Sequence, residues 1–155
     1  MKIRQMFREP IDKNDLLAVI RQALFMAIVG GLLIGAIHLL VDQIFHISLV
    51  WMFLFIFGLT LSRRIREAYK TYHIIYTIIA IIAVFIAFYL LNVVYLSGYL
   101  YMIGLLNTNY INDILNPFGY FSFLNFLKPG FFTVGNIIDV FFFILVNIYV
   151  VRYLK

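Results

Sequence analysis

One carboxylate lies inside an otherwise apolar stretch near the end of the sequence. Asp139 is nine positions into the run 131–151, where aliphatic and aromatic residues dominate. A charge at the centre of a bilayer costs at least about 2.5 kcal/mol, so this side chain must find a partner or stay protonated. Asn136 lies about one helical turn earlier, on the same face. Two interpretations stay open: an ion or proton site, or a hydrogen-bonded contact between helices.

His38 and Asp42 are four residues apart in the first apolar run, and His46 follows a short polar turn. Imidazole and carboxylate groups bind transition metals and can relay protons. Asp42, however, lies where the chain leaves the apolar run, a depth at which polar side chains are common. We therefore expect a solvated or capped turn, with no metal and no cofactor. His38 and the tyrosines are candidate partners for Asp139.

Small residues recur every four positions in the first apolar run. Ala27, Gly31 and Gly35 form a small-xxx-small series. Such a groove lets another backbone approach closely, and close packing drives the association of helices in lipid. Three partners are consistent with it: the second or fourth helix of the same chain, a second copy, or another membrane protein. Packing within the chain is the reading we favour.

The most polar block of the chain covers residues 63–73. It contains Arg63, Arg64, Arg66 and Lys70, and the spacing of Arg63 and Glu67 favours a helix. The block is too small a surface for nucleic acid. Cations beside a charged leaflet contribute about 1 kcal/mol each to membrane attraction. We expect these residues to contact anionic lipid or an acidic loop of a partner, and we expect no nucleic acid partner.

No motif in the sequence points to catalysis. G-x-S-x-G, H-E-x-x-H, Walker A and G-x-G-x-x-G are missing, and there is no cysteine. Intramembrane aspartyl proteases need two aspartates within their spans, and Asp139 has no second one. We assign no catalytic residue and expect a protein that is not an enzyme.

These residues belong to a chain that needs lipid around it. It has 155 residues, of which 65% are hydrophobic and 12% charged, whereas soluble domains average about 25% charged. A soluble domain of this size could not bury so much apolar surface. The richness in Ile, Phe, Asn and Tyr is typical of AT-rich bacterial genomes. We therefore expect one integral membrane domain over residues 1–155, in the cytoplasmic membrane of a bacterium.

Four apolar runs can cross the hydrocarbon core, which is about 30 Å thick. The predicted spans are residues 16–41, 44–62, 74–95 and 131–151. Residues 1–15 precede them, a loop at 63–73 joins the second to the third, and a connection at 96–130 joins the third to the fourth. Tyrosines, asparagines and prolines punctuate this connection, so we expect an interfacial helix within it.

The lysines and arginines set the orientation of these spans. All but Lys128 of the 12 fall on one side of the four-span arrangement. The positive-inside rule assigns that side, with both termini, to the cytoplasm. The predicted fold class is an all-α membrane protein, a four-transmembrane-helix bundle that is N-in and C-in.

Two functions from different classes fit these features. The first is a non-enzymatic accessory, assembly or immunity-type subunit of a membrane complex. It would act through helix–helix contacts with another membrane protein or a second copy of itself, surrounded by membrane lipids. The alternative is a small transporter or channel component with an ion or proton site at Asp139.

Overall fold

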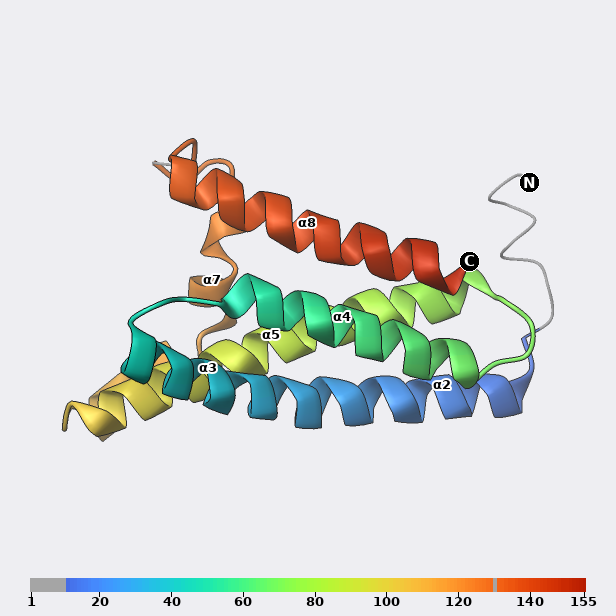
Figure 1. The fold of residues 1–155 in the computed structure, drawn as a ribbon, viewed down its shortest axis with the longest axis horizontal. Coiled ribbons are helices and arrows are strands. Elements are labelled where there is room, and N and C mark those ends of the chain that lie inside the picture. Colours follow the sequence, from blue (N-terminus) through green and yellow to red (C-terminus); the bar gives the residue numbers. More distant parts are fainter. Residues whose placement is uncertain (1–10, 130) are drawn as a thin grey trace.

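The computed structural model describes residues 11–129 and 131–155, and the regular secondary structure in these residues is helical throughout. The bundle begins with one continuous helix in three labelled parts, α2 (Lys13–Phe25), η1 (Met26–Gly30) and α3 (Gly31–Phe45). It continues with α4 (Val50–Glu67), α5 (Ile74–Met102) and α8 (Val134–Leu154). These helices lie side by side in an elongated bundle (Figure 1). The all-α fold class is confirmed.

Three of the described helices are long and apolar enough to cross a membrane: Lys13–Phe45, Ile74–Met102 and Val134–Leu154. The helix α4 is not among them because its last turns carry Arg63, Arg64, Arg66 and Glu67. Its apolar part, residues 50–61, rises about 18 Å, which is less than the roughly 30 Å of a hydrocarbon core. A fourth crossing therefore stays a prediction.

Two predicted starting points of spans differ from the structure. Residues 44 and 45 extend α3, because His46 adopts a left-handed φ of 53° and ends the helix there. The helix α4 begins only at Val50. Similarly, residues 131–133 precede α8, and Thr133 is its extended N-cap. Asp139 is thus the sixth residue of its helix, nearer the helix start than the middle.

The helix α5 runs on past the predicted span limit at residue 95. Gly98 lies within this helix, and the Leu39 side chain packs where a Cβ on Gly98 would lie. The chain leaves the helix at Ile103 and turns at Gly104, whose φ of +72° suits glycine.

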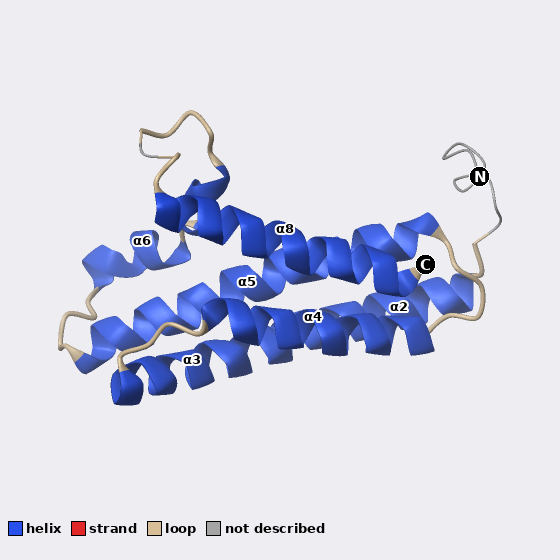
Figure 2. Cartoon of the chain, turned by 45° about the horizontal axis from the view of Figure 1, so that its top comes forward, coloured by secondary structure: helices blue, strands red, loops and turns tan. Residues whose placement is uncertain are grey.

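The connection after α5 contains short helices, in agreement with the expected helical content of residues 96–130. They are η2 (Thr108–Tyr110), α6 (Ile111–Leu115), α7 (Pro117–Tyr120) and η3 (Ser122–Leu124). This segment does not stay at the end of the bundle, since Phe123 is buried in the core. Figure 2 shows α6 on the outside of the bundle, beyond the end of α8.

The ends of the helices sort into two groups. The start of α2, the end of α4, the start of α5 and the C-terminus lie together at one end of the bundle (Figures 1 and 2). We call this the basic end, because Arg63, Arg64, Arg66, Arg152 and Lys155 belong to it. The connection of residues 103–133 and the turn after α3 lie at the opposite end.

Candidate functional site

The carboxylate of Asp139 is paired with a tryptophan. The indole Nε1 of Trp51 donates a hydrogen bond of 2.8 Å to Asp139 Oδ1, which joins α4 to α8. Both residues are half-buried. The hydrogen-bond partner of Asp139 is therefore Trp51, and neither His38 nor a tyrosine. Sequence reasoning missed Trp51, although it is the sole tryptophan of the chain and its indole N–H stands in an apolar run.

Trp51 also joins four elements through its ring. It stacks on Phe88 of α5 with centroids 5.6 Å apart, and on Phe142 of α8 at 6.3 Å. Phe123 of η3 and Phe143 of α8 meet it edge to face, at 6.0 and 6.5 Å. Such aromatic pairs contribute about 0.5–1.5 kcal/mol each beyond area burial. The residue is a structural centre of this half of the bundle.

The three polar side chains Asn136, Asp139 and Asn147 of α8 make separate contacts. The Asn136 amide donates to the carbonyl oxygens of Phe123 and Phe131, both at 3.0 Å, and so anchors the connection. The Asn147 amide donates to Phe143 O at 2.8 Å, and its Oδ1 is buried without a hydrogen-bond partner. Asn136 and Asp139 share a helix, but each serves a different contact.

His38 lies near the end of the bundle opposite the basic end. It is 4% exposed and stacks on Tyr95 with centroids 4.7 Å apart, and its Nδ1 is buried without a hydrogen-bond partner. The Tyr95 hydroxyl donates to Asp42 Oδ2 at 2.8 Å, which ties α5 to α3. Asp42 is thus bonded to another helix. Its backbone carbonyl also accepts a hydrogen bond of 2.8 Å from His46 N–H, so the exposed turn after α3 is capped as expected. Within the described ranges no three His, Asp or Glu residues are grouped as metal ligands would be.

The glycine groove is filled by the protein's own α5. A Cβ on Gly31 would lie 2.9 Å from Ala87 O, and one on Gly35 would lie 2.7 Å from Leu91 O. Ala27 is fully buried beside them. Packing within the chain was the favoured reading, but the partner is α5 and neither the second nor the fourth predicted span. The reason is a second small-residue stripe on α5, formed by the buried Ala80, Ala83 and Ala87.

The basic block is exposed at its end of the bundle. Arg63 and Glu67 form the ion pair expected from their spacing, with 3.0 Å between Nε and Oε1. The hydrogen bond and charge of Glu67 raise the pKa of Arg63. The Arg66 guanidinium lies over the Tyr69 ring, 5.0 Å from its centroid. These cations are available to lipid headgroups or an acidic partner.

Tyr69 connects the loop after α4 to the end of α8. Its buried hydroxyl donates a hydrogen bond to Leu154 O. Burial raises the pKa of Tyr69 to about 12. The hydroxyl therefore keeps its proton at neutral pH and remains a donor in this contact.

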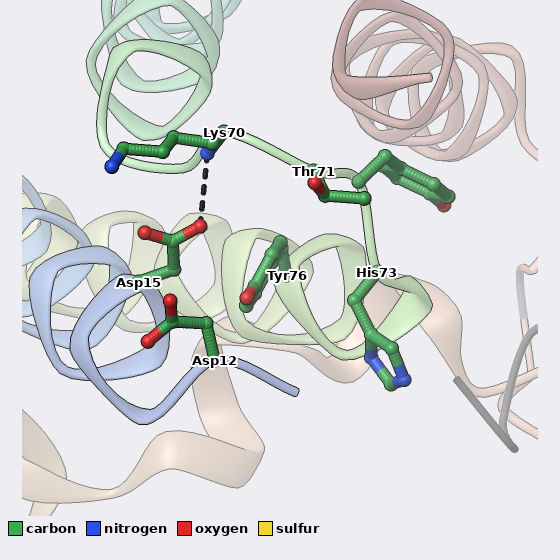
Figure 3. A pocket seen from close by; sticks show the side chains of 7 residues that line it. Asp12, Asp15, Lys70, Thr71, His73 and Tyr76 are labelled. Carbon is green, nitrogen blue, oxygen red and sulfur yellow. Dashed lines mark hydrogen bonds between the residues drawn. The ribbon is translucent and has the colours of Figure 1, made fainter. Parts of the chain in front are cut away.

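A polar pocket of about 360 Å³ opens at the basic end (Figure 3). Asp15 Oδ2 accepts a hydrogen bond of 2.9 Å from the backbone N–H of Lys70, and Asp12 caps α2 by accepting from Asn14 N at 2.8 Å. Figure 3 shows the Tyr76 hydroxyl directed toward these two carboxylates, while the His73 ring points away from them. His73 Nδ1 caps α5 by accepting from Ile75 N at 3.2 Å. Three of the four side chains are therefore engaged in helix capping or loop attachment.

The long-range polar contacts share one property: each joins two separate elements of the fold. They hold α4 to α8, α3 to α5, and the loop after α4 to the C-terminal turn. No protein family, no curated protein and no solved structure matches this chain.

Proposed function

We propose that this chain is a four-span membrane protein with both termini in the cytoplasm, acting without catalysis as an accessory, assembly or immunity-type subunit of a membrane complex. One observation carries this proposal. The two carboxylates in the apolar part of the bundle each accept a hydrogen bond from another helix of the same chain, Asp139 from Trp51 and Asp42 from Tyr95. These contacts hold the helices of the bundle together. The polar groups inside are therefore used for structure, and we assign the function to the outer surface of the bundle.

The position of α4 supports a fourth crossing. It lies between the helix α2–α3 and α8 along most of the bundle (Figure 1). Its apolar part is short, but arginine can extend its long side chain to the headgroup level, so the residues just before Arg63 can sit within the hydrocarbon. The alternative, a helix lying flat on the surface, would separate α4 from the partners it packs against.

The orientation can be tested with single cysteines, since the natural chain has none. We expect Asn125→Cys to react with a membrane-impermeant maleimide on intact cells. Thr71→Cys and Lys155→Cys should react only after the membrane is permeabilised, because they lie at the basic end. All three sites are exposed. Labelling of Lys155→Cys on intact cells would refute the proposed topology.

One groove on the bundle is suited to a partner's helix. It has a volume of about 520 Å³, lies between α4 and α8, and is lined largely by apolar side chains. Met52, Ile56 and Phe142 are exposed there. Because α5 already fills the glycine groove, a partner cannot use close backbone contact at that site. At the α4–α8 groove the partner's helix would instead insert its side chains between α4 and α8. We propose this groove as the surface that contacts the partner.

Site-specific photocrosslinking tests this function. A photoreactive phenylalanine analogue at Ile56 or Phe142 should give a protein adduct of defined mass in intact membranes. The same analogue at Leu33 or Ile37, exposed on α3, is the matched control and should give no such adduct. The mass separates a second copy from a different membrane protein.

Two results would overturn the proposal. One is a yield of protein adducts from the groove positions that is no higher than the yield from the control positions on α3. The other is an ion- or proton-dependent flux in proteoliposomes that disappears in a folded Asp139→Asn variant. The second result would establish the transporter alternative.

A further inference from the structure

A second groove separates α5 from α8 in the half of the bundle nearer the basic end. Its volume is about 580 Å³. Its walls are mainly apolar, with Ile81 and Phe85 from α5 and Ile144, Ile148 and Val151 from α8. Arg152 and Lys155 line it as well. The groove therefore combines a long apolar wall with two cations at one end.

In the other half of the bundle the chain itself fills the space between the same two helices. Phe121 of the connection packs on Phe85, with centroids 5.4 Å apart. Phe123 packs on Phe143 at 5.5 Å. The groove begins where Phe85, Phe143 and Leu124 form its inner end. The connection thus closes one half of the α5–α8 interface and leaves the other half open.

The open half needs an apolar occupant. An empty space forfeits the dispersion contacts of its walls. Away from Arg152 and Lys155, Asn147 is the one polar residue among those that line the groove, so water finds few hydrogen-bond partners there. In a bilayer the available apolar material is an acyl chain. Given the membrane crossing proposed above, we infer that a phospholipid with an anionic headgroup occupies the groove. One acyl chain lies between α5 and α8, and Arg152 and Lys155 bind the phosphate of a headgroup that carries no cation of its own, since a headgroup cation would be repelled by them.

The dimensions and charges agree with this occupant. From Phe143 to Lys155 the helix rises about 18 Å, slightly more than one leaflet of a core about 30 Å thick. The acyl chain of the lipid therefore reaches the bilayer centre when the lipid headgroup lies beside Lys155. An arginine guanidinium can bind phosphate oxygens in a bidentate manner. Neither Arg152 nor Lys155 forms an ion pair with another residue of the described ranges.

The groove between α4 and α8 provides an internal comparison. It has a similar volume, about 520 Å³, but its lining includes no lysine or arginine. It could hold a hydrocarbon chain without selecting a headgroup. Of the two grooves, only the one between α5 and α8 should therefore select an anionic headgroup.

Native mass spectrometry of the purified full chain tests this inference. The probe is an equimolar mixture of phosphatidylglycerol and phosphatidylcholine with identical acyl chains. Each cation near a charged headgroup contributes about fivefold in affinity, so the natural chain should retain phosphatidylglycerol roughly thirtyfold better. Arg152→Gln combined with Lys155→Gln should bring this preference close to unity. Ile148→Trp should reduce retention of both lipids, because the ring fills the groove.

Two controls make the result specific. Arg64→Gln combined with Arg66→Gln removes the same number of cations from the same end, outside the groove. These exposed side chains do not line the apolar groove that would hold the acyl chain, so this pair should lower the preference by much less than the groove pair. Ile56→Trp places the same ring in the α4–α8 groove and should have no effect. Equal retention of both lipids by the natural chain, or equal losses in the test and control pairs, would overturn the inference. Neither outcome depends on a protein partner, so the proposed subunit function stands or falls separately.

Discussion

Replacing Gly35 with valine is expected to prevent α3 from packing on α5 and to destabilise the whole bundle. The first added carbon would lie 2.7 Å from Leu91 O and 2.8 Å from Val94 Cβ. The nearest atom belongs to the backbone, so a change of rotamer cannot relieve the contact. Overpacking costs about 1–3 kcal/mol where neighbours can shift, and here the two helices must separate. We expect a loss of at least this size in the free energy of unfolding.

The measurement is the unfolding of each variant in mixed micelles, monitored by far-UV circular dichroism. Gly135→Val is the control. A Cβ on Gly135 meets no atom within 4 Å, and this residue also lies in a long helix. The comparison therefore separates the effect of crowding from the difference in helix propensity between glycine and valine. Equal unfolding curves for the two variants would mean that α5 does not fill the glycine groove in the membrane.

The amino-acid sequence predicted the helices well because the signal for each is local. A long apolar run identifies a membrane helix wherever it packs, and the small-xxx-small spacing of Gly31 and Gly35 identifies a groove. Neither pattern gives the direction in which the groove faces within the bundle. That direction depends on the alanine stripe of α5, more than 40 residues further along the chain. Matching the two stripes would have given the correct pairing.

The contact between Asp139 and Trp51 illustrates a different limit. Depth within an apolar run predicted that the carboxylate needs a partner, and this is correct. Residues 131–133 are not helical and Thr133 caps α8, so Asp139 is the sixth residue of its helix, and its depth in the bilayer stays a prediction. The partner is separated from Asp139 by 88 residues. Only the relative placement of α4 and α8 brings the indole to the carboxylate.

The connection after α5 shows why a hydrophobic loop is hard to place from sequence. Its aromatic residues were expected at the membrane interface, where tyrosine and tryptophan commonly lie. Phe118 and Phe126 are exposed, whereas Phe123 is 8% exposed and belongs to the core. Composition is the same at all three positions. The difference arises because Asn136 binds the Phe123 carbonyl and holds that part of the connection inside the bundle.

Truncating Trp51 is expected to cause the largest loss of stability of any single side-chain truncation in the half of the bundle near the connection. Trp51→Ala removes the ring that touches α5, α8 and η3, and also leaves Asp139 without its donor. Truncation of a buried aromatic residue costs about 3–5 kcal/mol. Trp51 is half-buried, so the lower part of this range applies, and the unpaired carboxylate adds to it. The variant should unfold at a markedly lower denaturant concentration in the same micelle assay.

Two further variants divide this loss between packing and hydrogen bonding. Trp51→Phe keeps an aromatic ring and removes the N–H donor, so it should lose about 1–3 kcal/mol. Asp139→Asn keeps an oxygen that can accept the indole hydrogen, so it should lose less than Trp51→Phe. The sole tryptophan allows a direct check, because its emission should stay blue-shifted in a folded Asp139→Asn variant. If Asp139→Asn unfolds the bundle while Trp51→Phe does not, then the carboxylate has a role beyond accepting this hydrogen bond.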